Sequence, residues 1–231
     1  MKKARSLPDE DSMFRAFTRI REGTAVAESA MEADFGLVSG FCEALRRVKG
    51  GSPRGAREQH ALRVEQVPSP LGPLIVAGDK DAVWLVEFGD RRMLERQFAA
   101  LRKRSGVEFF PGQTEPMRLL DDELAAYFAG DLTRFTTPLR FPGTPHQERV
   151  WRALADVPYG TTRTYGELAR RTGRPSAARA VARAVGDNRL AVVLPCHRVV
   201  GADGRLTGYA GGLWRKRCLL ALESGRDPGS V

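Results

Sequence analysis

The sequence has no long apolar run. No stretch approaches the roughly 18 consecutive apolar residues that a membrane-spanning helix requires. The basic residues 1–5 are not followed by an apolar segment, and residues 9–11 are acidic. A secretory signal needs an apolar segment at that place. We therefore expect a cytoplasmic protein that makes no contact with membranes.

Cysteine and histidine are scarce. The cysteines are Cys42, Cys196 and Cys218. An odd number at irregular spacing, without a CxxC pair, argues against a disulfide framework and fits a reducing compartment. The histidines are His60, His146 and His197. A structural zinc site would need four of these scattered groups to converge, so we predict no metal site.

Acidic residues are outnumbered by basic ones. The 231-residue chain has 37 Lys+Arg against 28 Asp+Glu, a formal net charge of +9. Such a surplus favours association with polyanions through phosphate contacts and counterion release. A biased composition also produces arginine-rich surfaces, so charge alone leaves nucleic-acid binding and a merely basic surface as alternatives.

Residues 1–60 differ in character from the rest of the chain. A helical pattern covers residues 25–31, and a second helix is predicted from a cap at Ser39 to Val48. Residues 50–53 end this helix, and the polar stretch to Glu58 is typical of a linker. We therefore predict a helical extension over residues 1–60.

Residues 61–140 have the pattern of a strand-rich lobe flanked by helices. Strands are predicted over residues 61–67, 74–77 and 83–88, separated by Pro, Gly and Asp turns. Helices are predicted over 91–103, with Met93, Phe98 and Leu101 on its buried side, and over 117–128, ended by Gly130. This lobe shows no constellation of reactive residues.

The last third of the chain is mainly helical. One helix face is formed by Val150, Leu154 and Val157. Residues 164–167 have the S/T-x-x-E form of a capping box, which predicts a helix from Tyr165 to about Gly173. A second helix is predicted over residues 177–185, stopped by Gly186. Two short helices around a tight glycine turn are typical of a helix-turn-helix.

A possible nucleophile follows these helices. Residues 191–194 are apolar and predict a buried strand that leads into Pro195, Cys196 and His197. Proline fixes the backbone before the cysteine. A neighbouring histidine can lower the pKa of a thiol or accept its proton. A free cysteine is also often a small core residue, so the dipeptide alone leaves both interpretations open.

The surroundings of Cys196 carry a resemblance to a known family. Residues 195–199 read Pro-Cys-His-Arg-Val. Matching flanks are Gly160, Thr164, Tyr165, Leu168, Ala169, residues 178–181, Asn188, Gly201, Gly204, residues 208–209 and 211–212, Leu219, Leu220 and Glu223. The chain thereby resembles the O6-alkylguanine-DNA alkyltransferases, also called methylated-DNA–protein-cysteine methyltransferases, without a gap over residues 144–223.

This resemblance implies an α/β fold in four parts. Residues 1–60 are the helical extension, and residues 61–140 are a small ribonuclease-H-like lobe of antiparallel strands and helices. Residues 141–225 form a mainly helical, winged-helix-like helix-turn-helix domain that binds DNA and carries the reaction. Residues 226–231 are a tail.

The resemblance also implies roles for the catalytic residues. Cys196 is the nucleophile that accepts the alkyl group, and His197 takes its proton through a water molecule. Glu223 orients and charge-stabilises His197, and Asn188 fixes the turn around the site. Tyr165 donates its hydroxyl to the extruded guanine. The thioether product has no easy leaving group, so each molecule acts once, and no cofactor is needed.

A further set of residues is implied to bind DNA. These are Arg179, Tyr165, Gly166, Arg174 and Ala178. Arg179 resembles the family's arginine finger, which fills the space left by an extruded base, and small residues let the backbone approach DNA closely. The expected partner is double-stranded DNA containing O6-alkylguanine, bound by a monomer. Action on O4-alkylthymine is left open.

Three positions depart from the family pattern. His146 stands where an aromatic residue is usual, Arg189 stands where many members have proline, and Ala210 stands where some have a hydroxyl residue. Arg189 puts the geometry of the turn after Asn188 in doubt. Ala210 removes a side-chain hydrogen bond to O6 from the loop at residues 209–212, which is expected to close the pocket.

The N-terminal extension carries a second resemblance. Residues 21–56 are similar to the second helix-turn-helix of AraC-type transcription regulators, a module that adaptive-response regulators join to an alkyltransferase. Only one of the two motifs of that unit fits here, and Lys49 replaces an aromatic residue of its core. We interpret the segment as a truncated remnant.

The resemblance implies that the protein repairs DNA by irreversible transfer of an alkyl group from O6-alkylguanine to Cys196, and two alternatives to repair are kept. The chain could be a DNA-binding regulator in which alkylation of Cys196 is a sensing event. It could also be a cysteine hydrolase, which would turn over repeatedly on esters or peptides. The absence of a recognisable hydrolase motif disfavours the second alternative.

Overall fold

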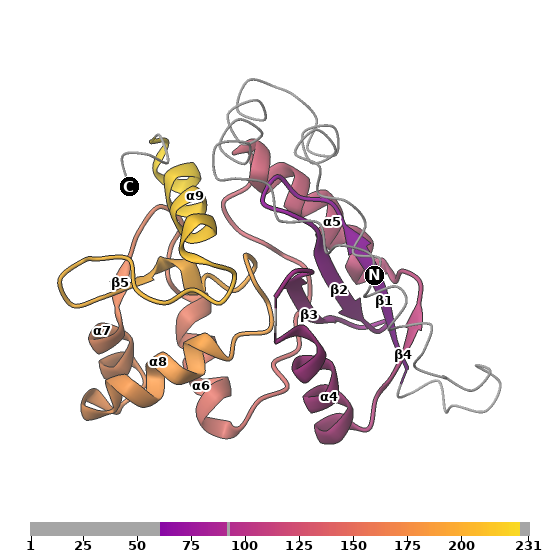
Figure 1. Ribbon diagram of the computed structural model, residues 1–231, viewed down its shortest axis with the longest axis horizontal. Helices are drawn as coiled ribbons and strands as arrows, with labels where there is room; N and C mark the ends of the chain where they lie inside the picture. Colours follow the sequence, from indigo (N-terminus) through magenta and orange to yellow (C-terminus); the bar gives the residue numbers. More distant parts are fainter. Residues whose placement is uncertain (1–60, 92, 227–231) are drawn as a thin grey trace, which may run out of the picture.

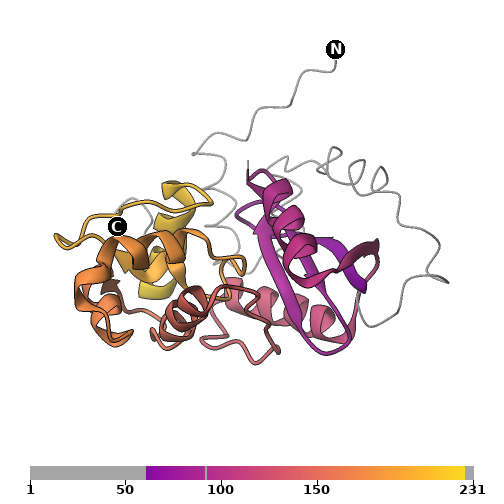
Figure 2. The same cartoon turned by 90° about the horizontal axis from the view of Figure 1, so that it is seen from below.

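The computed structural model describes residues 61–91 and 93–226 of the chain. The predicted extension over residues 1–60, with its AraC-like motif, and residues 227–231 of the predicted tail lie outside the described residues. The described part has a sheet-containing lobe and a helical lobe, which lie side by side in two perpendicular views (Figures 1 and 2). No helix in these ranges is long and apolar enough to cross a bilayer.

The first lobe is built on a four-stranded sheet. Its strands are β1 (Ala61–Val67), β2 (Leu74–Gly78), β3 (Val83–Phe88) and β4 (Glu108–Pro111), in the order β3-β2-β1-β4. The first three strands pair antiparallel, as predicted. β4 was not predicted, and it pairs parallel with β1, so the sheet is mixed and the all-antiparallel expectation is wrong. A short edge strand that ends in proline lacks the alternation by which strands are found.

Two helices cover opposite faces of this sheet. Successive residues of β2 belong to different core clusters: Leu74 packs with residues of α5 (Glu115–Ala129), and Ile75 packs with residues of α4 (Leu94–Ser105). The sheet is therefore buried on both sides, which explains why β2 is apolar throughout. α5 ends at Gly130 as predicted, with φ at 88°.

The start and the buried face of α4 differ from the prediction. The helix begins at Leu94 rather than at residue 91, and Met93 is 42% exposed instead of buried. Leu101 is fully buried as expected, but Leu94 and Gln97 complete the face, and Phe98 is only partly buried. The cause is a turn at the end of β3, in which the amide of Arg91 donates to the carbonyl of Phe88.

The second lobe contains α6 (Pro145–Ala155), the pair α7 (Tyr165–Arg171) and α8 (Ala178–Gly186), and α9 (Leu213–Ser224). The capping box at Thr164 and Glu167 is present, so α7 starts at Tyr165 as predicted. A 3-10 turn, Pro175–Ala177, precedes α8. Gly186 is the last residue of α8 rather than its stop, because Asp187 occupies the C-cap.

The predicted strand over residues 191–194 is wrong. These residues form a turn in which Val192 has a φ of 68°, and Cys196–Arg198 form a 3-10 helix that leads into the two-residue strand β6 (Val199–Val200). β6 pairs with β5 (Arg163–Thr164). The apolar run is buried because it packs between the lobes. Strand periodicity cannot distinguish such a buried turn from a short buried strand.

The two lobes share one hydrophobic core. A single cluster of buried residues joins Val86 and Phe88 of β3 to Trp151 of α6, Val181 of α8 and Leu219 of α9. The backbone of β3 also bonds the turn before Cys196: the amide of Val86 donates to Arg189, and the amide of Ala191 donates to Val86, both at 2.7 Å. The first lobe therefore holds the segment that carries the cysteine.

Candidate active site

Cys196 lies at the bottom of a pocket between the lobes. Its side chain is buried, at 7% exposed, and the pocket has a volume of about 550 Å³. The wall is formed by Glu87, Arg91, Tyr165, Ala182, Val185, Gly186, Asn188, Ala191 and residues 207–211. The wall thus combines the end of β3, both helices of the helix-turn-helix and the loop before α9.

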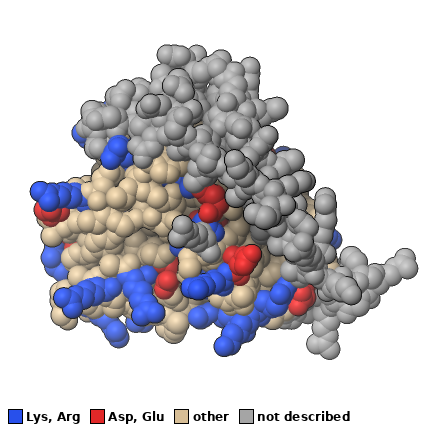
Figure 3. Space-filling model, viewed as in Figure 1, with Lys and Arg blue, Asp and Glu red and all other residues tan. Residues whose placement is uncertain are grey.

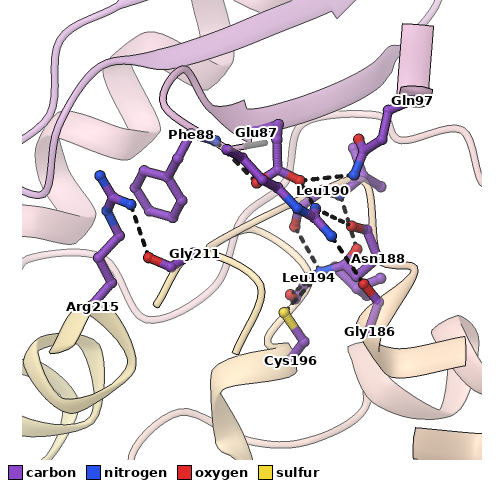
Figure 4. A network of polar contacts seen from close by, with 11 residues as sticks. Glu87, Phe88, Gln97, Gly186, Asn188, Leu190, Leu194, Cys196, Gly211 and Arg215 are labelled. Carbon is purple, nitrogen blue, oxygen red and sulfur yellow. Dashed lines mark hydrogen bonds and ion pairs between the residues drawn. The ribbon is translucent and has the colours of Figure 1, made fainter. Parts of the chain in front are cut away.

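Asn188 holds the turn that presents the thiol (Figure 4). Its carboxamide oxygen accepts the amide of Leu190 at 2.9 Å, and its Nδ2 donates to the carbonyl of Leu194 at 3.0 Å. The same Nδ2 also donates to Sγ of Cys196 at 3.0 Å. One side chain therefore satisfies the backbone of the turn and contacts the sulfur. Arg189 does not disturb this turn, because its guanidinium donates to the carbonyl of Pro142 at 2.7 Å.

Behind the thiol, His197 and Glu223 form a buried pair. Nε2 of His197 lies 2.7 Å from Oε1 of Glu223, and both side chains are fully buried. The carboxylate also accepts hydrogen bonds from the Tyr127 hydroxyl at 2.7 Å, from Nε of Arg198 at 2.9 Å and from the amide of Gly160 at 3.2 Å. A buried charge is stable only with such partners.

These contacts set the protonation states of the pair. Burial alone would raise the pKa of Glu223, but the hydrogen bonds from His197 and Arg198 lower it to about 2. Burial lowers the pKa of His197, although Glu223 opposes this shift. The site therefore holds an ionised carboxylate beside a neutral imidazole, which is the form that can accept a proton.

The pKa of the Cys196 thiol is shifted in the opposite direction to the pKa values of Glu223 and His197. Burial raises the pKa of Cys196, while the hydrogen bond from Asn188 and the charges of Arg91 and Lys216 lower it. Nδ1 of His197 is buried and has no hydrogen-bond partner among the described residues. The sulfur and the imidazole thus make no direct hydrogen bond, and the water between them stays a prediction.

The residues predicted to bind DNA lie along the helix-turn-helix. Tyr165 is half-buried and lines the pocket, whereas Arg174 and Arg179 are exposed. Gly166 and Ala178 are partly exposed. An added Cβ at Gly166 would meet no atom closer than 3.9 Å, so packing within the protein does not require glycine there. A close approach of a ligand backbone is a separate reason for a small residue.

The loop at residues 207–211, which lines the pocket, is held by α9. Arg215 is buried, and it donates to the carbonyl of Gly211 at 2.8 Å, to the carbonyl of Leu71 at 2.7 Å and to Asp90 at 3.0 Å. Its guanidinium lies 4.1 Å from the centre of the Phe88 ring. A Cβ at Gly211 would come within 2.8 Å of that ring, so only glycine fits.

Two pocket residues were missed from the sequence. Glu87 and Arg91 of the first lobe stand in the pocket wall, although the sequence showed no constellation of reactive residues in that lobe. An acidic residue inside the apolar strand 83–88 was the available signal, since a buried carboxylate needs a partner. Lys216, in α9, was also missed, and burial lowers its pKa to about 8.

The surface beside the pocket is basic. Lys and Arg side chains gather along the lower edge of the molecule in Figure 3, where α7, α8 and α4 lie in Figure 1. The exposed arginines of the helix-turn-helix are Arg170, Arg171, Arg174, Arg179 and Arg183. Among the described residues, no group of three or more His, Cys, Asp or Glu side chains could hold a metal ion.

In the described part of the chain, fold and site together define a protein with a buried cysteine in a pocket beside a basic helix-turn-helix. The family model described as the DNA-binding domain of 6-O-methylguanine DNA methyltransferase matches residues 145–225. A methylated-DNA–protein-cysteine methyltransferase of Mycobacterium tuberculosis is 46% identical over 170 residues, which cover 74% of this chain and 97% of the relative. The enzyme of that name from Methanosarcina acetivorans is 43% identical over 155 residues, covering 67% and 94%.

Solved structures with a similar fold carry names of the same kind as these relatives. The crystal structure of Mycobacterium tuberculosis OGT in complex with DNA has a TM-score of 0.60 at 43% identity, covering 73% of this chain and 95% of that chain. An archaeal O6-methylguanine-DNA methyltransferase from Pyrococcus kodakaraensis has a TM-score of 0.53 at 28% identity, covering 70% and 98%. The chain belongs to the family of methylated-DNA–protein-cysteine methyltransferases.

Proposed function

We propose that this protein repairs DNA by moving an alkyl group irreversibly from O6-alkylguanine to Cys196. One observation carries the proposal: the thiol lies at the bottom of a pocket, contacted by Asn188, in the residue next to a buried imidazole–carboxylate pair. The relatives are named for transfer between methylated DNA and a protein cysteine. This chain supplies the acceptor thiol and a base for such a transfer.

The transfer is a displacement at the alkyl carbon. His197 accepts the thiol proton through a water molecule, and Glu223 stabilises the charge that develops on the imidazole. The sulfur then attacks the alkyl carbon, so that a sulfur–carbon bond forms and the bond from that carbon to O6 breaks. The electron pair stays on guanine, which takes up a proton. The thioether has no easy leaving group, so each molecule acts once and needs no cofactor.

Access to O6 requires that the nucleotide leave the base stack. The exposed arginine Arg179, in the first turn of α8, is placed to fill the vacated space, while Arg174 contacts phosphate. Gly166 and Ala178 let the backbone approach the DNA closely. The helix enters the minor groove, where sequence readout is poor, and this suits a protein that acts in any sequence.

The extruded guanine enters the pocket between Tyr165 and the loop at residues 207–211. The Tyr165 hydroxyl donates to N3 of the base and helps to neutralise it as it leaves. Ala210 has no hydroxyl group, so O6 is recognised by backbone groups of this loop.

The location, the oligomeric state and the domain division follow from the same family resemblance. The protein acts as a cytoplasmic monomer on duplex DNA that contains O6-alkylguanine. Residues 61–140 form the ribonuclease-H-like lobe and residues 141–225 the winged-helix-like domain, and they work as one unit because they share a core cluster.

The proposal is tested by stoichiometry on a defined lesion. A duplex with one O6-methylguanine is titrated with protein, and restored guanine is counted. Repair of one lesion per protein molecule, lost in Cys196→Ala, is expected. Retained DNA binding without restored guanine would instead indicate a regulator, and repeated turnover on esters would indicate a hydrolase; either result would overturn the proposal.

A further inference from the structure

A buried ion pair lies at the end of β3, beside the pocket. Glu87 is 1% exposed, and its carboxylate forms an ion pair with Arg91. The same carboxylate accepts Nε2 of Gln97 at 2.9 Å and the amide of Phe88 at 3.0 Å. The arginine is therefore held from within the first lobe by a carboxylate that is itself fixed by further hydrogen bonds.

Arg91 extends from this pair across to the second lobe. It donates to the carbonyl of Gly186 at 3.1 Å and to the carbonyl of Asn188 at 3.3 Å. Figure 4 shows Glu87 and Gln97 on one side of this network and Gly186, Asn188 and Cys196 on the other. Gly186 is the last residue of α8, so the guanidinium binds a carbonyl at the negative end of the helix that carries Arg179. One cation thus joins the sheet, the recognition helix and the turn of the nucleophile.

The charged and titratable groups around the thiol come from several elements. Arg91 and Lys216 are the cations that act on Cys196. Tyr165 and Tyr209 are phenols whose pKa values are raised by burial and further by the sulfur. Glu87 lines the same pocket, and Asp187 acts on Arg91. Lys216 donates to the carbonyls of Val199 and Thr207, so Arg91 is the cation that also bonds the turn at Asn188.

We propose that Arg91, held by Glu87, is a positioning residue for alkyl transfer, which fixes the Asn188 turn and supplies positive charge to the Cys196 thiolate. The inference rests on the proposed function and assigns part of it to the first lobe. Neither stability nor packing accounts well for the arrangement, because a buried ion pair can usually be replaced by apolar residues without loss of stability. Both residues of the pair instead line the pocket that contains Cys196, and the charge of Arg91 acts on the thiol.

The test separates the charge of Arg91 from structural damage. Arg91→Met leaves Glu87 unpaired, and a lone carboxylate would itself raise the pKa of the thiol. The double variant Glu87→Gln/Arg91→Met removes both charges and is the decisive one. Arg91→Lys keeps the charge without the fork that binds two carbonyls. Arg118→Met, which loses an exposed ion pair on α5, is the matched control.

Two readouts are compared across the neutral and alkaline range. Iodoacetamide modification of Cys196 is followed by the mass of the peptide of residues 190–198, and methyl transfer is followed on O6-methylguanine duplex. The double variant is expected to react more slowly at neutral pH, by up to about tenfold, and to recover in alkali, because Arg91 acts on the thiol more strongly than Glu87 does. Arg91→Lys should fall between it and the parent, and Arg118→Met should match the parent.

The outcomes distinguish this inference from the proposed function. Titration of the double variant like the parent, or an equal loss of rate at every pH, would overturn the inference that Arg91 supplies charge to the thiolate. Failure of methyl transfer in the parent itself, with the thiol titration still shifted in the variants, would instead overturn the proposed function.

Discussion

At the scale of single residues, the surroundings of Cys196 shift the pKa of its thiol in both directions. Burial raises the pKa of its thiol, and Asn188, Arg91 and Lys216 lower it. Because burial dominates, the resting form at neutral pH is the thiol, so a base must take its proton during the reaction. His197 is kept neutral by burial and is able to do so.

Asn188 is expected to act on both the turn and the sulfur. Asn188→Ala leaves the amide of Leu190 without its partner and removes one of the two hydrogen bonds to the carbonyl of Leu194, which costs about 1–3 kcal/mol of unfolding free energy. Asn188→Asp can still accept from Leu190, but it puts a negative charge near Cys196. Because this carboxylate is buried and faces the carbonyl of Leu194, the aspartate variant should lose at least as much stability as the alanine variant and have a higher thiol pKa. Urea unfolding and iodoacetamide titration measure the two effects, and the reverse ranking would contradict this account.

Glu223→Gln is expected to slow alkyl transfer without loss of DNA binding. The neutral amide no longer stabilises a charged His197, so the imidazole becomes a weaker base, and the pKa of the Cys196 thiol rises. Single-turnover rates and binding to undamaged duplex, compared with the parent, check this. A thiol that titrates as in the parent would show that Glu223 does not act through His197.

The sequence predicts some of these residues and not others. Cys196 and His197 lie next to each other in a motif, so they could be found by reading the chain. The contact of Glu87 with Arg91 is also local, but its place beside Cys196 depends on the bonds of Val86 to Arg189 and Ala191. Those bonds join segments that are about a hundred residues apart, and no local pattern encodes them.

At the scale of elements, the two ends of α8 have different surroundings. Arg179 lies in its first turn, and the carbonyl of Gly186 at its other end is bound by Arg91. The exposed end is thus free to contact DNA while the other end is fixed beside the pocket.

Arg179→Ala is therefore expected to weaken repair of duplex DNA by about tenfold or more, and to leave the reaction with free O6-methylguanine nearly unchanged. The physical reason is that the arginine acts on base extrusion, which costs a few kcal/mol in a duplex and nothing for a free base. Arg152→Ala, which removes an exposed arginine of α6, serves as the control for loss of charge. Equal losses on both substrates would exclude the finger role.

Element boundaries show what periodicity can predict. The capping box at Thr164 and the glycine after α5 mark helix ends by local hydrogen bonding, and both were placed correctly. Residues 191–194 were predicted as a strand because they are all apolar. They form a buried turn instead, because its shape depends on hydrogen bonds of the Asn188 side chain. Side-chain bonds of this kind leave no periodic signal.

At the scale of the whole molecule, the buried carboxylate Glu223 links stability to pH. Its pKa of about 2 lies below the ordinary value of 4.5, so its contribution is complete above about 4.5 and is lost as the pH falls toward 2. A difference of this size corresponds to about 3 kcal/mol of unfolding free energy. Urea unfolding in this pH window should show a steeper loss for the parent than for Glu223→Gln. Tyr127→Phe, which removes one hydrogen bond of the carboxylate, should give a smaller change. Identical pH slopes for parent and Glu223→Gln would refute this link.

The shared core explains why the arrangement of the lobes could not be predicted. The switch from strand to helix periodicity near residue 141 indicates two parts. It does not indicate that Phe88 of the first lobe packs with Trp151 of the second in one cluster, or that the end of β3 forms a pocket wall. Such contacts form only when the surfaces of the two lobes pack together, and no local sequence pattern records them.

The central claim is that the sulfur of Cys196 becomes permanently alkylated, and mass spectrometry of the peptide of residues 190–198 tests it most directly. After incubation with a duplex that contains one O6-methylguanine, we predict that this peptide gains one methyl group on Cys196. Cys218, buried in α9, should stay unmodified. An unchanged peptide after an incubation in which guanine was restored in the duplex, or a methyl group on any other residue, would contradict the account.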